Sequence, residues 1–381
     1  MKVVPKQFFS PNNYPRIRNF LLLINNKPPR IMRMNLDAIK KNWIYVGMLL
    51  FILLFTTFSL ARKSSFPKRS QSFSDAEKEI TSLQGRVDVE KILKEREKKE
   101  TPGFYLFGFL SFFVFTAFLI GFFLNLSLLR RKKFSLTNTL FPQVNWEISD
   151  LVRAGIFFCF FLYLLLFLEK LFLPSSFFNS FEKLLFFTLS NTILTEVAVF
   201  LFVFNFLIKK HVSSKSCLTA LFSVGEKKTK KIALGVRAYF HLLPILFFVG
   251  LLTALLIKIS GYSPAEQTFA TFLLQVKSPL LLYFSIFTAV IFAPIFEEFL
   301  FRAFAYSALR RRFGVKGGIL FSSFLFALLH RSLYGFLAIF ILGVVLSYLY
   351  EKTGSLIPSI SLHILNNGIA SLFLLSLKSL L

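Results

Sequence analysis

Long runs of apolar residues alternate with short polar segments along this chain. A transmembrane helix requires about 20 consecutive, mostly apolar residues. By that rule the pattern predicts an all-α fold, a polytopic membrane bundle of about eight or nine helices. The nine candidate spans are residues 43–61, 104–129, 153–173, 184–208, 233–257, 279–301, 317–334, 335–350 and 356–378.

Two polar segments interrupt the apolar pattern. Residues 1–42 are basic and have no helical period, whereas residues 62–103 carry mixed charges with a rough helical spacing of apolar positions. The run at 43–61 resembles a signal peptide in its flanking charge, but its small-residue cleavage pattern is poor, which favours an uncleaved anchor. The predicted parts are a basic cytoplasmic segment (1–42), a membrane anchor (43–61), a polar charged loop (62–103), N-terminal membrane helices (104–257) and a C-terminal core of membrane helices (279–375).

Composition supports a membrane protein. Hydrophobic residues make up 55% of the chain and charged residues 17%, a ratio that excludes a soluble domain, a disordered chain and a disulfide scaffold. The net charge is +26, yet the basic residues gather in alternate short loops between the apolar runs. Such clusters orient a protein in the lipid bilayer and do not indicate nucleic-acid binding, and here they predict a cytoplasmic amino terminus.

Several polar side chains fall inside the predicted membrane helices, where an ionisable group costs about 2.5–3.5 kcal/mol. We interpret Glu196 and His241 as structural partners of neighbouring helices. The other polar side chains concentrate in the last four spans, at Glu297, Glu298, Arg302, His330, His363, Asn366 and Asn367. At about 1.5 Å rise per residue, Glu298, His330 and His363 lie about 18, 20 and 10 Å inside the membrane, so they can meet at one point.

These residue types fit the hydrolysis of an acyl group. Two adjacent carboxylates cannot both ionise cheaply in a medium of low dielectric constant, so one of them can hold a proton taken from water. Arginine can stabilise the other carboxylate, while histidine can bind a metal or polarise a carbonyl. Asparagine can donate to a developing oxyanion.

Structural and transport roles are the alternatives. The Glu298–Arg302 pair can simply neutralise a helix kink, and Asn366 and Asn367 can join helices by hydrogen bonds. Buried carboxylates also occur in ion-coupled transporters, although this chain shows no internal repeat. The sequence contains neither the H-E-x-x-H zinc motif nor the G-x-S-x-G motif of serine hydrolases.

Three short motifs resemble those of one protease family. Residues 297–302 (EEFLFR) are similar to the E-E-x-x-x-R motif of the CPBP family, which comprises CAAX proteases and bacteriocin-processing enzymes and is also called ABI. Residues 326–330 (FALLH) resemble its F-x-x-x-H motif, and residues 363–367 (HILNN) its H-x-x-x-N motif. Each motif alone is weak, but the three occur in the family's order within residues 279–375.

The resemblance implies an intramembrane endopeptidase like the type II CAAX prenyl endopeptidases. By this resemblance Glu297 activates water together with His330, His363 and Asn367 form the oxyanion site, and Glu298 and Arg302 hold Glu297 in place. The same set of His and Glu side chains could bind a divalent metal such as zinc, and the sequence leaves this open.

The sequence therefore predicts hydrolysis of a membrane-anchored or lipidated peptide, in a protein of the bacterial plasma membrane. The alternative is a non-catalytic scaffold or bacteriocin-immunity protein with the same bundle. Ion-coupled transport is a third and weaker hypothesis.

Overall fold

The computed structural model describes residues 43–63, 102–129, 146–174, 177, 180–208, 227–260 and 268–380. The predicted segment 1–42 and nearly all of the predicted loop 62–103 lie outside the described residues. The chain divides into two compact units, Met1–Leu50 and Phe51–Leu381. The candidate active site and the helices packed around it belong to the second unit.

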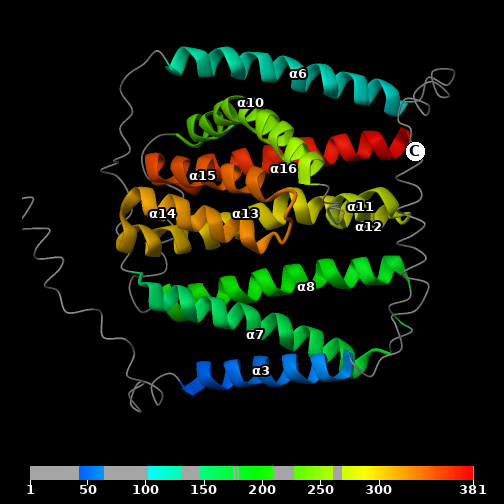
Figure 1. Cartoon of the computed structure of the whole chain (residues 1–381), viewed down its shortest axis with the longest axis vertical. Helices are drawn as coiled ribbons and strands as arrows, with labels where there is room; N and C mark the ends of the chain where they lie inside the picture. The colour runs from blue at the N-terminus through cyan, green and yellow to red at the C-terminus, as the bar shows by residue number, and fades with distance from the viewer. Residues whose placement is uncertain are drawn as a thin grey trace, which may run out of the picture. The chain divides into compact units, whose positions relative to one another are not determined.

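The described part consists of helices joined by short turns and contains no strand, which confirms the all-α prediction (Figure 1). Its helices are α3 (Trp43–Lys63), α6 (Pro102–Leu129), α7 (Ile148–Phe172), α8 (Phe181–Phe202), η3 (Val203–Ile208), α10 (Lys228–Ser260), α11 (Thr268–Gln275), α12 (Pro279–Phe287), η4 (Thr288–Phe292), α13 (Ala293–Glu298), η5 (Phe299–Tyr306), α14 (Ser307–Leu329), α15 (Phe336–Thr353) and α16 (Leu356–Leu380). The elements labelled η are π-helical. The short helix α11 and the π-helical segments were not predicted.

Seven helical runs in the described part are long and apolar enough to cross a membrane, so the predicted count of eight or nine is slightly too high. Two features of the described helices account for the difference. The predicted spans 279–301 and 317–334 fall in the two arms of one run, Pro279–Leu329, which counts once although it turns back at Gly314. The described apolar part of α3, Trp43–Thr57, is shorter than the other runs. The chain is a membrane protein.

The long run Pro279–Leu329 folds back on itself at Gly314. This residue has φ 72° and ψ −179°, a backbone conformation that is essentially restricted to glycine. The ring of Phe301 before the break lies 5.1 Å from the ring of Phe326 after it. A Cβ atom on Gly318 would lie 2.8 Å from the Cα of Arg310, so the two arms also approach closely beside the turn. The run is therefore a helical hairpin.

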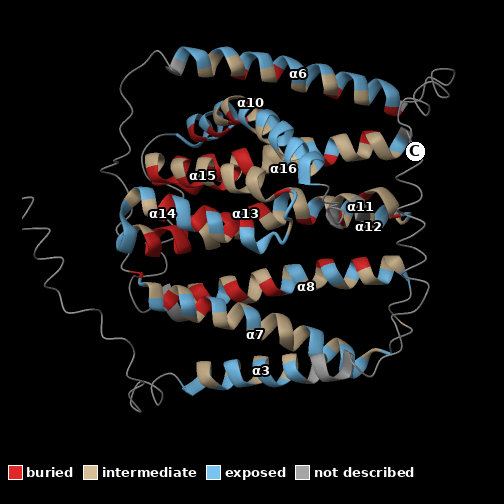
Figure 2. Cartoon of the chain, in the orientation of Figure 1, coloured by how far each residue is buried: buried red, intermediate tan, exposed pale blue. Residues whose placement is uncertain are grey.

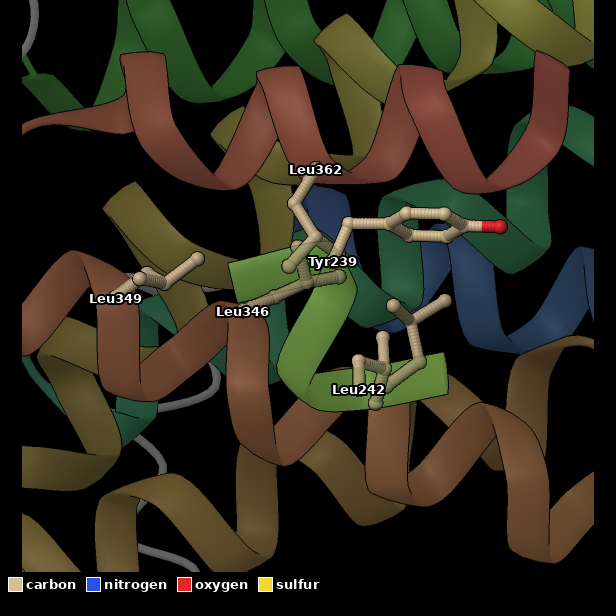
Figure 3. Packing of buried hydrophobic residues seen from close by; sticks show 6 residues of the cluster. Tyr239, Leu242, Leu346, Leu349 and Leu362 are labelled. Atoms are coloured by element: carbon tan, nitrogen blue, oxygen red, sulfur yellow. The ribbon is translucent and has the colours of Figure 1, made fainter. Parts of the chain in front are cut away.

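An apolar cluster joins α10, α15 and α16. Tyr239 and Leu242 of α10 pack against Leu346 and Leu349 of α15 and Leu362 of α16 (Figure 3). Burial is dense on η5 and continues on α14 and α15, whereas α3 and α6 are largely exposed, as expected for helices that face lipid (Figure 2). The hairpin and α16 thus form the interior in which polar groups can meet.

Candidate active site

The glutamate doublet lies on a short α-helix between two π-helical segments. Glu297 and Glu298 end α13, which follows η4 and precedes η5. In η4 the N–H of Ala293 donates to the carbonyl of Thr288, five residues earlier. The next bond of this kind would run from residue 294 to Ala289, but Pro294 has no N–H. The carbonyl of Ala289 is therefore left for another donor.

Glu298 lies at the centre of a buried ionic cluster. Its Oε2 is 3.3 Å from Nε of Arg302, one helical turn later, and both side chains are fully buried. Its Oε1 accepts a hydrogen bond of 3.0 Å from Nδ1 of His363 on α16. Arg302 and His363 thus both face one carboxylate, an arrangement that offsets the cost of burying its charge.

His363 also faces the first glutamate of the doublet. Its Nε2 lies 3.6 Å from Oε2 of Glu297, so the two ring nitrogens face two different carboxyl groups. The Glu297 side chain is 19% exposed, whereas that of Glu298 is 0% exposed. Only Glu297 is accessible to water or a substrate, so the two adjacent glutamates have different environments.

Phe326 joins the three motifs. Its ring lies 4.3 Å from Cζ of Arg302, within the range of a cation–π interaction. The same ring lies 5.7 Å from the ring of His363 and 4.5 Å from that of His330. Phe326 is 0% exposed. It supports the guanidinium, whose Nη1 and Nη2 have no hydrogen-bond partner.

Asn367 is fixed from two sides. Its Nδ2 donates a hydrogen bond of 2.9 Å to the carbonyl of Ala289, the group that Pro294 leaves without a backbone donor. Its Oδ1 accepts a hydrogen bond of 3.2 Å from Nδ2 of Asn366. An amide nitrogen has two hydrogens, so Asn367 retains a second one that no hydrogen bond in the described part uses.

His330 lies at the edge of this cluster. It is exposed, at the end of α14, and its Nδ1 donates a hydrogen bond of 2.7 Å to the carbonyl of Phe326. The described contacts do not include an ion pair between His330 and Glu297. The structure therefore brings Glu297, Glu298, Arg302 and His363 into direct contact, while His330 is linked to them through Phe326.

His241 and Glu196, the two residues that the sequence indicates as structural partners, lie on α10 and α8. Nδ1 of His241 on α10 donates a hydrogen bond of 2.8 Å to Oδ1 of Asn125 on α6, and Nδ2 of Asn125 donates to the carbonyl of His241 at 3.0 Å. This reciprocal pair agrees with a structural role for His241. Glu196 on α8 is different, because its Oε2 is buried without a hydrogen-bond partner.

Sequence reasoning missed two contributors to the site. Pro294 was visible as a proline inside an apolar run, a signal of a local change in helix geometry. The carbonyl of Ala289 had no signal of its own, because only the π-helical backbone makes it available.

The side chains are not arranged as a metal site. The described part of the chain contains no group of three or more His, Cys, Asp or Glu side chains placed to hold a metal ion. Nδ1 of His363 is committed to Glu298 by a hydrogen bond, and the cationic Arg302 already neutralises Glu298. The reaction that we propose for the site therefore has no step through a metal.

Comparison with known proteins supports the motif analysis. No curated protein and no solved structure matched the chain. One family model matched, and its residues include all three motifs. Residues 279–369, which contain the site, match the type II CAAX prenyl endopeptidase Rce1-like family, and this match confirms the resemblance drawn from the motifs.

Proposed function

We propose that this chain is an intramembrane endopeptidase of the CAAX-protease type, which hydrolyses a peptide bond with water activated by Glu297. The observation that carries the proposal is the placement of His363 between two carboxyl groups of unequal exposure. A glutamate that is 19% exposed can contact water, and its fully buried neighbour can hold the histidine. The family match over residues 279–369 supports the same reaction class.

The reaction balances with the residues of this chain. Glu297 takes a proton from water, and the resulting hydroxide oxygen forms a bond to the carbonyl carbon of the peptide. The carbonyl becomes an oxyanion. Glu297 then passes its proton to the amide nitrogen, the C–N bond breaks as the oxyanion becomes a carbonyl again, and an amine and a carboxylic acid leave, with the acid proton passing to the amine. His330, which the family resemblance pairs with Glu297, is exposed and so can contact substrate or water.

Asn367 and His363 are the donors for the oxyanion in this proposal. The second amide hydrogen of Asn367 is available for the purpose, and the hydrogen bond to Ala289 holds the amide in one orientation. Arg302 and Glu298 act on His363 and are too deeply buried to contact substrate. They are positioning residues.

The substrate in this proposal is a membrane-anchored or lipidated peptide, because the site lies within membrane helices. We propose the bacterial plasma membrane as its location, with the amino terminus in the cytoplasm. The loop charges support this orientation.

The test compares host cells that carry the wild-type chain or the Glu297→Gln variant at matched membrane levels. Peptides of the membrane fraction are quantified by mass spectrometry. We expect a precursor to accumulate with Glu297→Gln and its clipped product to disappear.

Glu169→Gln is the matched control. Glu169 is also a glutamate of a membrane helix, but it lies on α7 and accepts a hydrogen bond of 2.8 Å from Asn191. Its substitution should leave the peptide profile unchanged. If Glu297→Gln and the wild type give the same profile while a strain lacking the chain has a phenotype, the protein is a scaffold and the proposal is wrong.

A further inference from the structure

Glu196 is a carboxyl group of the membrane interior that the proposed mechanism does not use. It lies on α8, between the buried residues Thr195 and Val199, and its Oε2 has no hydrogen-bond partner. A buried polar group of this kind is costly to leave without a partner in a membrane protein. Packing alone therefore does not explain why a glutamate occupies position 196.

The face of α8 that carries Glu196 packs beside the catalytic doublet. Phe200 lies four residues after Glu196 and so shares its helix face. The Phe200 ring contacts those of Phe296 and Phe299 at 5.3 and 4.6 Å. These two residues flank the doublet Glu297–Glu298, so α8 packs against α13 beside the doublet. The carboxyl groups of Glu196 and Glu297 are not joined by a hydrogen bond.

The carboxyl groups at this position outnumber their cationic partners. Glu196 on α8 and Glu297 and Glu298 on α13 are three carboxyl groups on packed helices, whereas Arg302 and, when protonated, His363 are the cationic partners that the described contacts provide. Three ionised carboxylates would leave one negative charge without a partner in a medium of low dielectric constant, which is costly. One carboxyl group is therefore expected to retain its proton.

We propose that Glu196 is a third carboxyl group of the active site, and that Glu196 and Glu297 together hold one proton, which resides on one carboxyl group or the other. Glu298 already has Arg302 and His363 as ionic partners, so the shared proton belongs to the other two. With the proton on Glu196, Glu297 is a carboxylate ready to accept a proton from water. Glu196 is then a positioning residue, and its role rests on the proposed peptidase reaction.

The other titratable side chains around α8 are paired elsewhere or distant. Glu169 of α7 accepts a hydrogen bond from Asn191, and Glu182 at the start of α8 accepts one from the N–H of Ser278. Lys183 lies over the ring of Phe177, and Tyr283 of α12 is 69% exposed. None of these groups supplies the missing positive charge.

Infrared spectroscopy of the purified full-length chain tests the shared proton without any substrate. A protonated carboxyl group gives a C=O stretching band that is separate from that of a carboxylate. We expect one such band to be lost in Glu196→Gln and shifted in Glu297→Gln, while Glu169→Gln leaves it unchanged. If no band responds to both substitutions, the carboxyl groups share no proton and the proposal is overturned.

Kinetics then tests the consequence for catalysis, with the peptide identified by mass spectrometry as substrate. Leucine at position 196 has no polar atom, so Glu196→Leu should lower kcat by about tenfold or more and change KM little. Glu196→Gln, which keeps a hydrogen-bond donor of similar shape, should recover most of kcat near neutral pH. It should also remove one ionisation from the pH–rate profile.

The role of Glu196 and the peptidase function can fail independently in these experiments. If Glu196→Leu and Glu196→Gln both keep the wild-type kcat and pH–rate profile, Glu196 has no role in the reaction. If the wild-type chain cleaves no peptide but the infrared band responds to both glutamates, the peptidase function fails while the carboxyl pair stands.

Discussion

Asn367 on α16 donates a hydrogen bond of 2.9 Å to a backbone carbonyl, that of Ala289, which Pro294 leaves without an N–H partner. The proline thus determines where the asparagine amide is held. In an apolar membrane run a proline is tolerated when another donor satisfies the freed carbonyl, and here that donor belongs to the proposed oxyanion site.

Restoring the backbone donor should disturb the proposed oxyanion site. In Pro294→Ala the new N–H competes with Asn367 for the carbonyl of Ala289. We expect kcat to fall by about tenfold or more, because a misplaced oxyanion donor is costly. Steady-state cleavage measures this effect. Pro244→Ala, at another proline inside a membrane helix, is the control and should keep kcat.

Breaking the buried ion pair should destabilise the protein more than removing both partners. Glu298→Gln and Arg302→Met each leave a charge without its partner, at a cost of about 3–5 kcal/mol in the free energy of unfolding. The double variant removes both charges and should recover a large part of that loss. Unfolding in detergent measures the three variants. Fully additive losses would show that the two side chains do not interact.

The ring of Phe326 should stabilise the protein by more than the burial of its apolar volume alone. Phe326→Leu removes the cation–π contact with Arg302, so we expect a loss of about 1–3 kcal/mol in the free energy of unfolding. Phe324→Leu is the same change on the same helix, at a ring that is 46% exposed. It should have little effect. Equal losses in the two variants would assign the effect to helix α14 as a whole.

The hairpin turn should depend on backbone conformation at one glycine. At both Gly314 and Gly250 a Cβ atom would have no neighbouring atom within 4 Å, so the alanine methyl group fits at both sites. Only Gly314 has a positive φ, of 72°. Gly314→Ala should therefore lose about 1–3 kcal/mol of unfolding free energy, and Gly250→Ala in α10 should be neutral or stabilising. Similar thermal stability of the two variants would contradict this account.

Removal of metal should leave the proposed reaction intact. Glu298 faces Arg302 and His363, so it does not need a dication for neutralisation. We expect cleavage to be unchanged after treatment with a zinc chelator, with metal analysis as a check on removal. Loss of cleavage that added zinc restores would contradict the metal-free mechanism.

The sequence predicted the helical class and the meeting of the motifs, because membrane helices have long apolar runs and charged groups inside them must find partners. The contact of His363 with both Glu297 and Glu298 follows from that rule. The predicted count of eight or nine spans exceeds the seven runs of the described part, in part because the two predicted spans on either side of Gly314 count together as Pro279–Leu329. The neighbourhood of Glu196 depends on how α8 packs on α13, which no local pattern encodes.

The two π-helical segments, η4 and η5, make the length of this stretch of chain as important as its composition. An α-helix turns by about 100° per residue, so the gain or loss of a single residue redirects every side chain that follows. A side-chain exchange within η4 alters packing, whereas a deletion there would turn Glu297 and Glu298 away from α16. Insertions and deletions should consequently be rarer than substitutions in this stretch as the protein evolves.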